Sequence, residues 1–183
     1  MIRTITSNAN PAGPMSPASL LAAIVPVSCG LLGAALSNLP VSFTGGVVPP
    51  PVLALMPVYF WALVRPDLMP VAVAFGVGLC QDLLSGSPPG FWTAAFVAVY
   101  ALLDRNRESL AGLAGVGAIL GFALAALVAS AAVYFIAWFY FLHRPPLTPL
   151  VLQLVASVLC YVPALPVLNW IQRNIVGALR TEF

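Results

Sequence analysis

The chain has 183 residues, of which 61% are hydrophobic and only 7% are charged. A soluble domain carries about 25% charged residues, so an ordinary soluble fold of this composition would expose apolar patches that monomers do not tolerate. Composition therefore indicates an integral membrane protein and excludes a disordered chain. Seven scattered arginines without any lysine also exclude the basic stripe of a nucleic-acid-binding protein.

The segment before the first apolar stretch is polar and rich in Pro, Ser and Asn. We expect residues 1–18 to form a flexible cytoplasmic tail. A cleaved signal peptide is the alternative, because Arg3 precedes an apolar stretch. However, the run from Leu20 to Leu36 is longer than the apolar region of a signal peptide, which is about 7–15 residues. An uncleaved first helix is therefore favoured.

Six apolar segments follow, and a transmembrane helix needs roughly 20 apolar residues. The second, third and fourth segments are short, whereas the fifth is too long for one perpendicular helix and requires tilt, an extension or a re-entrant piece. We predict an all-α, polytopic membrane helix bundle with six transmembrane helices in residues 19–172, and a short cytoplasmic C-terminus in residues 173–183. The predicted spans are Ser19 to Leu39, Val47 to Val64, Leu68 to Leu84, Gly90 to Leu103, Leu110 to about Leu142, and Leu147 to Asn169.

The arginines predict the orientation of these spans, because cytoplasmic loops hold the positive excess. With six spans and the N-terminus inside, six of the seven arginines lie on the cytoplasmic side and only Arg144 lies outside. Both termini of the multi-pass chain are then cytoplasmic. The cytoplasmic arginines are Arg3, Arg65, Arg105, Arg107, Arg173 and Arg180.

The stretch from Met56 to Gly90 predicts a helical hairpin. Pro57 is expected to kink the second span, Pro66 to end it, and Asp67 to cap the next helix. Gly76 and Gly78 would let another helix approach the third span closely.

Asp82 is the acidic residue with the least favourable predicted surroundings. It follows Gln81 near the C-terminal end of the third span, where the helix dipole and the membrane both disfavour a carboxylate. One possibility is simple hydration at the headgroup level. Otherwise, we hypothesise that Asp82 is held by Arg144, by His143, or by backbone donors in the turn from Gly86 to Gly90, and that this contact fixes a rim for a partner.

The sequence offers little for catalysis or metal binding. Cys29, Cys80 and Cys160 lie singly within predicted spans, and His143 is the one histidine. A His-based catalytic triad is therefore impossible within this chain, and no Cys or His spacing indicates a zinc site. The absence of lysine excludes a phosphate-binding P-loop. We predict no catalytic residue, metal or cofactor.

The fifth span carries small residues at intervals of four, which suits close helix packing. These residues are Gly117, Gly121, Ala125 and Ala129. Internal packing is favoured over contact with another protein's helix. Nearer the end of the span, an aromatic belt at the outer interface is favoured over an aromatic transport cage. The belt would consist of Tyr134, Trp138, Tyr140 and neighbouring phenylalanines.

The motif residues between positions 57 and 90 resemble the MreD family of rod-shape-determining membrane proteins. The length, the six-span outline and the short loops fit the same family, and the resemblance extends over roughly Leu20 to Arg173. The predicted partner-binding or structural motif consists of Pro57, Tyr59, Pro66, Gly78, Gln81, Asp82, Gly86 and Gly90, with Leu63, Leu79 and Cys80 contributing to the resemblance.

The resemblance implies a non-enzymatic scaffold of the bacterial cell-elongation complex, located in the bacterial inner membrane. It would bind MreC and, with RodA, its transpeptidase and indirectly the MreB filament, help direct peptidoglycan synthesis and rod shape. It also implies a fold similar to the substrate-binding subunits of energy-coupling-factor transporters. The rival is a small-molecule-binding subunit of a vitamin transporter, although few intramembrane polar groups are available to converge on a ligand.

Overall fold

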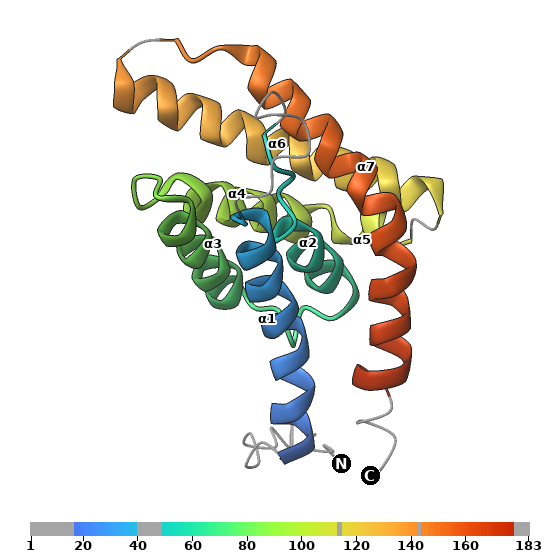
Figure 1. Ribbon diagram of the computed structural model, residues 1–183. Helices are drawn as coiled ribbons and strands as arrows, with labels where there is room; N and C mark the ends of the chain where they lie inside the picture. Colours follow the sequence, from blue (N-terminus) through green and yellow to red (C-terminus); the bar gives the residue numbers. More distant parts are fainter. Residues whose placement is uncertain (1–16, 40–48, 113–114, 143, 178–183) are drawn as a thin grey trace, which may run out of the picture.

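The computed structural model describes residues 17–39, 49–112, 115–142 and 144–177, and these residues are helical with connecting turns (Figure 1). The predicted tail therefore lies almost entirely outside the described residues, as does His143. The helices are α1 (Pro17–Ser37), α2 (Leu55–Val64), α3 (Val71–Ser85), α4 (Phe91–Arg105), α5 (Arg107–Ala111), α6 (Val116–Phe141) and α7 (Leu147–Ile171), followed by a π-helical turn, η1 (Gln172–Val176).

The core is built around α2, whose residues from Leu55 to Ala62 are all buried. A helix that is hydrophobic on every face is stable only when neighbours surround it. Contacts with α1, α4, α5, α6 and α7 provide these neighbours. The α3–α4 hairpin extends the bundle, because α3 also packs on α1, and α4 also packs on α6.

The second predicted span begins too early. Helix α2 starts at Leu55 rather than Val47, and residues 49–54 are not α-helical. Three successive prolines at positions 49–51 explain this, because proline lacks an N–H and disfavours helical geometry in the preceding residue. Pro57 therefore lies in the first turn of α2, where the missing N–H costs no helical hydrogen bond. The predicted kink at Pro57 is wrong.

The long fifth predicted span is divided in two. Short α5 and 26-residue α6 are separate helices, and Gly115 before α6 adopts a positive φ of 57°. A residue with a side chain rarely takes this conformation. A 26-residue helix is still about 39 Å long, so tilt or projection beyond the bilayer is still required of α6.

Helix α7 changes direction along its length (Figure 1). Its first half lies along α6, and its second half turns away from α6 and runs down the picture. Pro163 and Pro166 lie inside the helix and account for the change, since each removes a backbone hydrogen bond.

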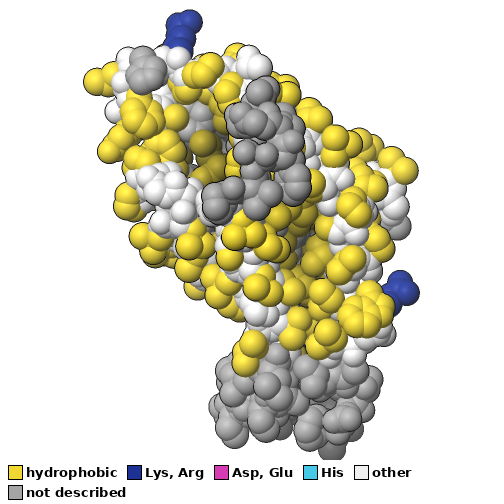
Figure 2. Space-filling model, in the orientation of Figure 1, with side chains coloured by type: hydrophobic (Ala, Val, Ile, Leu, Met, Phe, Trp, Pro, Cys, Tyr) yellow, Lys and Arg dark blue, Asp and Glu magenta, His cyan; other side chains and the backbone are white. Residues whose placement is uncertain are grey.

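The face of the bundle that Figure 2 shows is dominated by apolar side chains in its described part. One stripe of α7 is exposed at intervals of four residues, at Leu147, Val151, Val155 and Leu159. Helix α6 and the continuous run from Leu147 to Val176 are each long and apolar enough to cross a membrane. Such a surface suits contact with lipid rather than water.

Candidate functional site

Asp82 is the centre of the most highly connected polar site in the described residues. Its side chain is fully buried between α3 and the start of α4. One carboxylate oxygen accepts hydrogen bonds from Ser87 Oγ at 3.0 Å and Trp92 N at 2.7 Å. The other accepts from Gly90 N at 2.9 Å, Thr93 N at 3.1 Å and Thr93 Oγ1 at 2.7 Å. We call Asp82, Ser87, Gly90, Trp92 and Thr93 the Asp82 cluster.

The cluster explains how a carboxylate is tolerated inside this bundle. The N-terminus of α4 has backbone N–H groups without partners in the helix, and it is the positive end of the helix dipole. The carboxylate of Asp82, on the neighbouring helix α3, accepts hydrogen bonds from these N–H groups and places a negative charge beside the positive end of the dipole. The N-cap residue of α4 is Gly90, which has no side chain that could accept a hydrogen bond from the helix. Asp82 therefore acts as the N-cap of α4 from eight or more residues away in sequence.

The hypothesis that Arg144 holds Asp82 is wrong. Arg144 is exposed, and its guanidinium carbon lies 5.8 Å from the centre of the Trp138 ring. The backbone alternative is the one that the geometry supports, since Gly90 N belongs to the proposed turn, and the donors extend beyond it to Trp92 and Thr93. Hydration does not fit a side chain with no exposed surface.

Glycines allow the Asp82 cluster to close. A Cβ atom on Gly78 would lie 2.7 Å from Thr93 Cα, so only glycine permits the observed approach of α3 to α4. Gly86 and Gly90 have positive φ angles of 66° and 110° and form the turn between the helices. Gly76 was predicted to serve close packing as well, but nothing lies within 4 Å of a Cβ placed there.

Gln81 is buried beside this cluster, with only 4% of its surface exposed. Its Oε1 atom has no hydrogen-bond partner within the described part of the chain. The motif residues Gly78, Gln81, Asp82, Gly86 and Gly90 are thus gathered at one α3–α4 junction.

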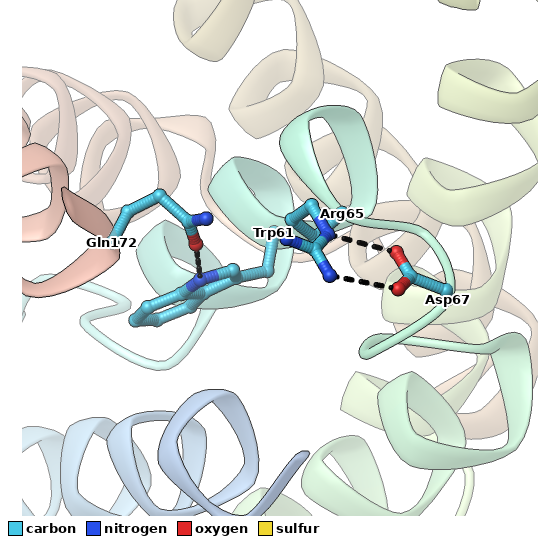
Figure 3. A network of polar contacts seen from close by, with 4 residues as sticks. All are labelled: Trp61, Arg65, Asp67 and Gln172. Carbon is cyan, nitrogen blue, oxygen red and sulfur yellow. Dashed lines mark hydrogen bonds and ion pairs between the residues drawn. The ribbon is translucent and has the colours of Figure 1, made fainter. Parts of the chain in front are cut away.

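The remaining motif residues lie in α2 and the turn after it. Pro66 is half-buried in that turn, where the guanidinium of Arg65 binds both carboxylate oxygens of Asp67 at 3.0 and 3.1 Å (Figure 3). The hydrogen bonds to Asp67 raise the pKa of the Arg65 guanidinium. Asp67 does not occupy the predicted capping position, because the N-cap of α3 is Pro70.

A second polar contact links α2 to η1 (Figure 3). The indole Nε1 of Trp61 donates a hydrogen bond of 2.8 Å to Oε1 of Gln172 in η1. The buried indole has no exposed surface, so this bond provides its N–H with a partner in the apolar core. The contact holds η1 close to the C-terminal half of α2.

Tyr59 joins α2 to α6 and α7 through aromatic packing. Its ring meets Phe122 and Tyr161 edge to face, with centroids 5.4 and 5.8 Å away, and those two rings stack at 4.0 Å. Gly121 is buried against this group, and a Cβ placed there would collide with the Tyr59 hydroxyl. Ala125 is also buried, so at these two positions the small-residue seam faces the bundle itself. Gly117 is half-buried.

A cleft of about 950 Å³ opens beside this aromatic group, and we call it the α7 cleft. Sequence reasoning missed it, because its walls come from five elements, α2, α5, α6, α7 and η1, which span more than a hundred residues of the chain. Only Tyr59 among its lining residues belongs to the predicted motif. The lining also includes Phe60, Leu63, Leu110, Ala118, Tyr161, Leu165, Pro166, Asn169, Trp170, Arg173 and Asn174.

Three polar side chains that the sequence analysis left without a structural role stabilise the non-helical segment before α2. Ser157 Oγ accepts a hydrogen bond of 3.0 Å from Val52 N, and Ser37 Oγ accepts one of 2.9 Å from Leu53 N. Gln153 Nε2 donates one of 3.0 Å to the carbonyl of Pro50. Backbone groups in an apolar bundle need such partners. The proline run at positions 49–51 could have indicated this need. Prolines interrupt a helix, so the N–H groups that follow them require partners outside it.

The described residues contain no group of three or more His, Cys, Asp or Glu side chains that could hold a metal ion. The predicted aromatic belt lies at the end of α6, where Trp138, Phe139 and Tyr140 are exposed. Aromatic side chains at one end of an apolar helix are typical of the membrane–water interface.

The described residues form an all-helical bundle, and two of its helices are long and apolar enough to cross a membrane, which is typical of a helical membrane protein. The family model described as rod shape-determining protein MreD matches residues 18–169. The chain therefore belongs to the MreD family and acts in the determination of rod shape. No curated protein and no solved structure matches the chain.

Proposed function

We propose that this protein is a non-enzymatic scaffold of the bacterial cell-elongation complex, which binds MreC in the inner membrane and helps direct peptidoglycan synthesis. The family match over residues 18–169 carries the proposal. It includes both motif regions, the α3–α4 junction and the α2 turn. RodA and its transpeptidase are further partners within the same complex, and the MreB filament is an indirect one.

The polar chemistry of the structure supports a scaffold. The carboxylate of Asp82 is occupied by five hydrogen bonds and has no exposed surface, so it is committed to shaping the α3–α4 junction. A rigid junction of this kind provides a fixed surface for a membrane partner.

The partner proposal is tested by purifying the tagged, full-length chain from its native membrane and quantifying the retained proteins by mass spectrometry. MreC should be enriched over its level with a tagged polytopic control protein of similar abundance. Gly78→Leu should lower MreC retention, because the added side chain forces α3 away from Thr93. Gly76→Leu is the matched control on the same helix. Equal MreC recovery with the control protein would contradict the proposal.

We also propose six membrane spans, formed by α1, α2, α3, α4, α6 and α7, with both termini cytoplasmic. The positions of three arginines support this orientation. Arg65 ends α2, Arg107 donates a hydrogen bond to the carbonyl of Ala62 near that end, and Arg173 lies in η1, which Trp61 contacts through Gln172. These cations therefore lie at neighbouring helix ends, as the positive-inside rule requires.

Cysteine labelling and reporter fusions test this topology in intact cells, in a background with the native cysteines replaced. A reporter at Phe183 should report cytoplasm, and cysteines introduced at Ser87 and Pro145 should react with a membrane-impermeant reagent. A cysteine introduced at Ser42, which lies outside the described residues, should react as well. Protection at Ser87 from outside would contradict the six-span arrangement.

A further inference from the structure

The α7 cleft has the dimensions of a ligand site. Its volume of about 950 Å³ falls within the range of roughly 300–1,000 Å³ that small-molecule sites occupy. It lies between the C-terminal half of α2, the start of α6 and the second half of α7 with η1. Arginines are found at these helix ends, which suits a position at the membrane surface.

The lining of the cleft is amphipathic. Phe60, Leu63 and Leu165 provide apolar surface, whereas Arg173 and Asn174 are exposed polar residues in η1. Arg173 is the one charged residue in the lining. No carboxylate forms an ion pair with it among the described residues. The site thus combines a free positive charge with an apolar wall.

Tyr161 supplies a second, independent observation. Its side chain is 99% buried, because only 1% of its surface is exposed, and it lines the cleft. Its ring packs against Tyr59 and Phe122, and its hydroxyl makes no hydrogen bond within the described residues. The buried polar atoms without a partner in the described residues are Gln81 Oε1 and Arg107 Nε, and the Tyr161 hydroxyl is not one of them, so we infer that a molecule in the cleft can reach it.

We propose that the α7 cleft binds an anionic phospholipid of the surrounding membrane. The phosphate is recognised by the Arg173 guanidinium and the amide of Asn174, since charge-assisted hydrogen bonds to phosphate are strong. An acyl chain covers the wall of Phe60, Leu63 and Leu165, and the Tyr161 hydroxyl donates to an oxygen of the lipid. A free phosphate offers the same anionic chemistry but leaves the apolar wall uncovered, which favours the lipid.

The experiment measures lipid bound to the full-length, purified chain by native mass spectrometry. The probes are phosphatidylglycerol and phosphatidylcholine with identical acyl chains. Phosphatidylglycerol should be retained preferentially, and Arg173→Gln should lower its apparent affinity about tenfold, as loss of a charge-assisted hydrogen bond implies. Arg173→Lys should retain most of the binding, and Tyr161→Phe should reduce it by a smaller factor.

Arg105→Gln is the matched control, because Arg105 is exposed at the end of α4 and does not line the cleft. An equal loss of binding in Arg105→Gln and Arg173→Gln would overturn the proposal in favour of general surface attraction. Displacement of the lipid by inorganic phosphate or by glycerophosphoglycerol at concentrations similar to that of the lipid would overturn the lipid assignment.

If Arg173→Gln fails to fold, the unaltered protein still tests the proposal. Phosphatidylglycerol should raise its midpoint of thermal unfolding in detergent more than phosphatidylcholine does, because a ligand that binds only the folded state stabilises that state. Equal shifts with both lipids would overturn the proposal. The test does not depend on MreC retention, so a failure here leaves the scaffold proposal intact.

Discussion

The Asp82 cluster and the α7 cleft differ in whether their polar side chains have hydrogen-bond partners within the protein. In the cluster, both oxygens of one carboxylate accept hydrogen bonds and no surface of Asp82 is exposed. In the cleft, the cation of Arg173 and the hydroxyl of Tyr161 have no protein partner within the described residues, and an open volume separates the helices. Saturated polar groups stabilise a fold, whereas unsatisfied ones are available for binding.

The largest effect should come from removing the acceptor at the centre of the cluster. Asp82→Ala leaves the N–H groups of Gly90, Trp92 and Thr93 without a partner inside the bundle. We expect a loss of about 3–5 kcal/mol in the free energy of unfolding, as for breaking a buried charged interaction. Denaturant titration in mixed micelles measures this loss, and a change below about 1 kcal/mol would contradict the assigned role.

A Cβ atom at Gly78 should have the next largest effect. Gly78→Ala places a methyl group against the backbone of Thr93, which cannot yield as a flexible side chain would. We expect destabilisation by about 1–3 kcal/mol. Gly76→Ala is the control on the same helix, where open space should leave stability unchanged or raise it by up to about 1 kcal/mol. Equal effects at both positions would refute the close approach of α3 to α4.

The aromatic wall of the cleft is tested by a pair of substitutions that should compensate each other. Gly121→Ala collides with the Tyr59 hydroxyl, and Tyr59→Phe removes that hydroxyl. The alanine alone should destabilise the protein by about 1 kcal/mol, and the double variant should recover most of that loss. Thermal unfolding of the four proteins provides the cycle. No coupling between the two positions would show that they do not touch.

Two hydroxyl deletions compare the cluster with the cleft directly. Thr93→Val removes a 2.7 Å hydrogen bond to Asp82 and should cost about 1–3 kcal/mol. Tyr161→Phe removes a hydroxyl that has no partner in the described structure and should change lipid-free stability by less than about 0.5 kcal/mol. A larger loss at Tyr161 than at Thr93 would reverse the assignment of the two regions.

The smallest expected effect is the coupling energy between substitutions at Asp82 and Arg144. The guanidinium of Arg144 lies beside Trp138, and the carboxylate of Asp82 is occupied by other donors. The stability changes of Asp82→Asn and Arg144→Gln should therefore add, with a coupling below about 0.5 kcal/mol. Coupling above that value would restore the ion pair that the sequence analysis proposed.

Composition and hydropathy predicted the helices well, because long apolar runs leave few alternatives. Each of the six predicted spans overlaps one of the helices α1, α2, α3, α4, α6 and α7, although four of these helices extend beyond the predicted bounds. The errors lie where backbone chemistry interrupts an apolar run, at the prolines of positions 49–51 and at Gly115. Apolar content alone does not distinguish a helix from a non-helical segment whose N–H groups at Val52 and Leu53 donate to Ser157 and Ser37.

The site was predictable in part. Asp82 was identified because a carboxylate near the C-terminal end of a helix is unfavourable, and one proposed solution, backbone donors in the following turn, was close to the observed one. Its additional donors at the N-terminus of α4 depend on how two helices meet, which spacing does not encode. The α7 cleft was missed for the same reason, since Tyr59 and Arg173 are brought together by the bend of α7.

The non-helical segment before α2 links the order of synthesis to the order of folding. Pro50 and Val52 obtain their hydrogen-bond partners from Gln153 and Ser157 in α7, about a hundred residues later in the chain. While α7 is still inside the ribosome, these backbone groups have no such partner, so they must form hydrogen bonds with water or with other polar groups. The middle of the bundle is thus completed only when α7 is inserted, so a chain that stops before α7 would leave this segment open to proteases.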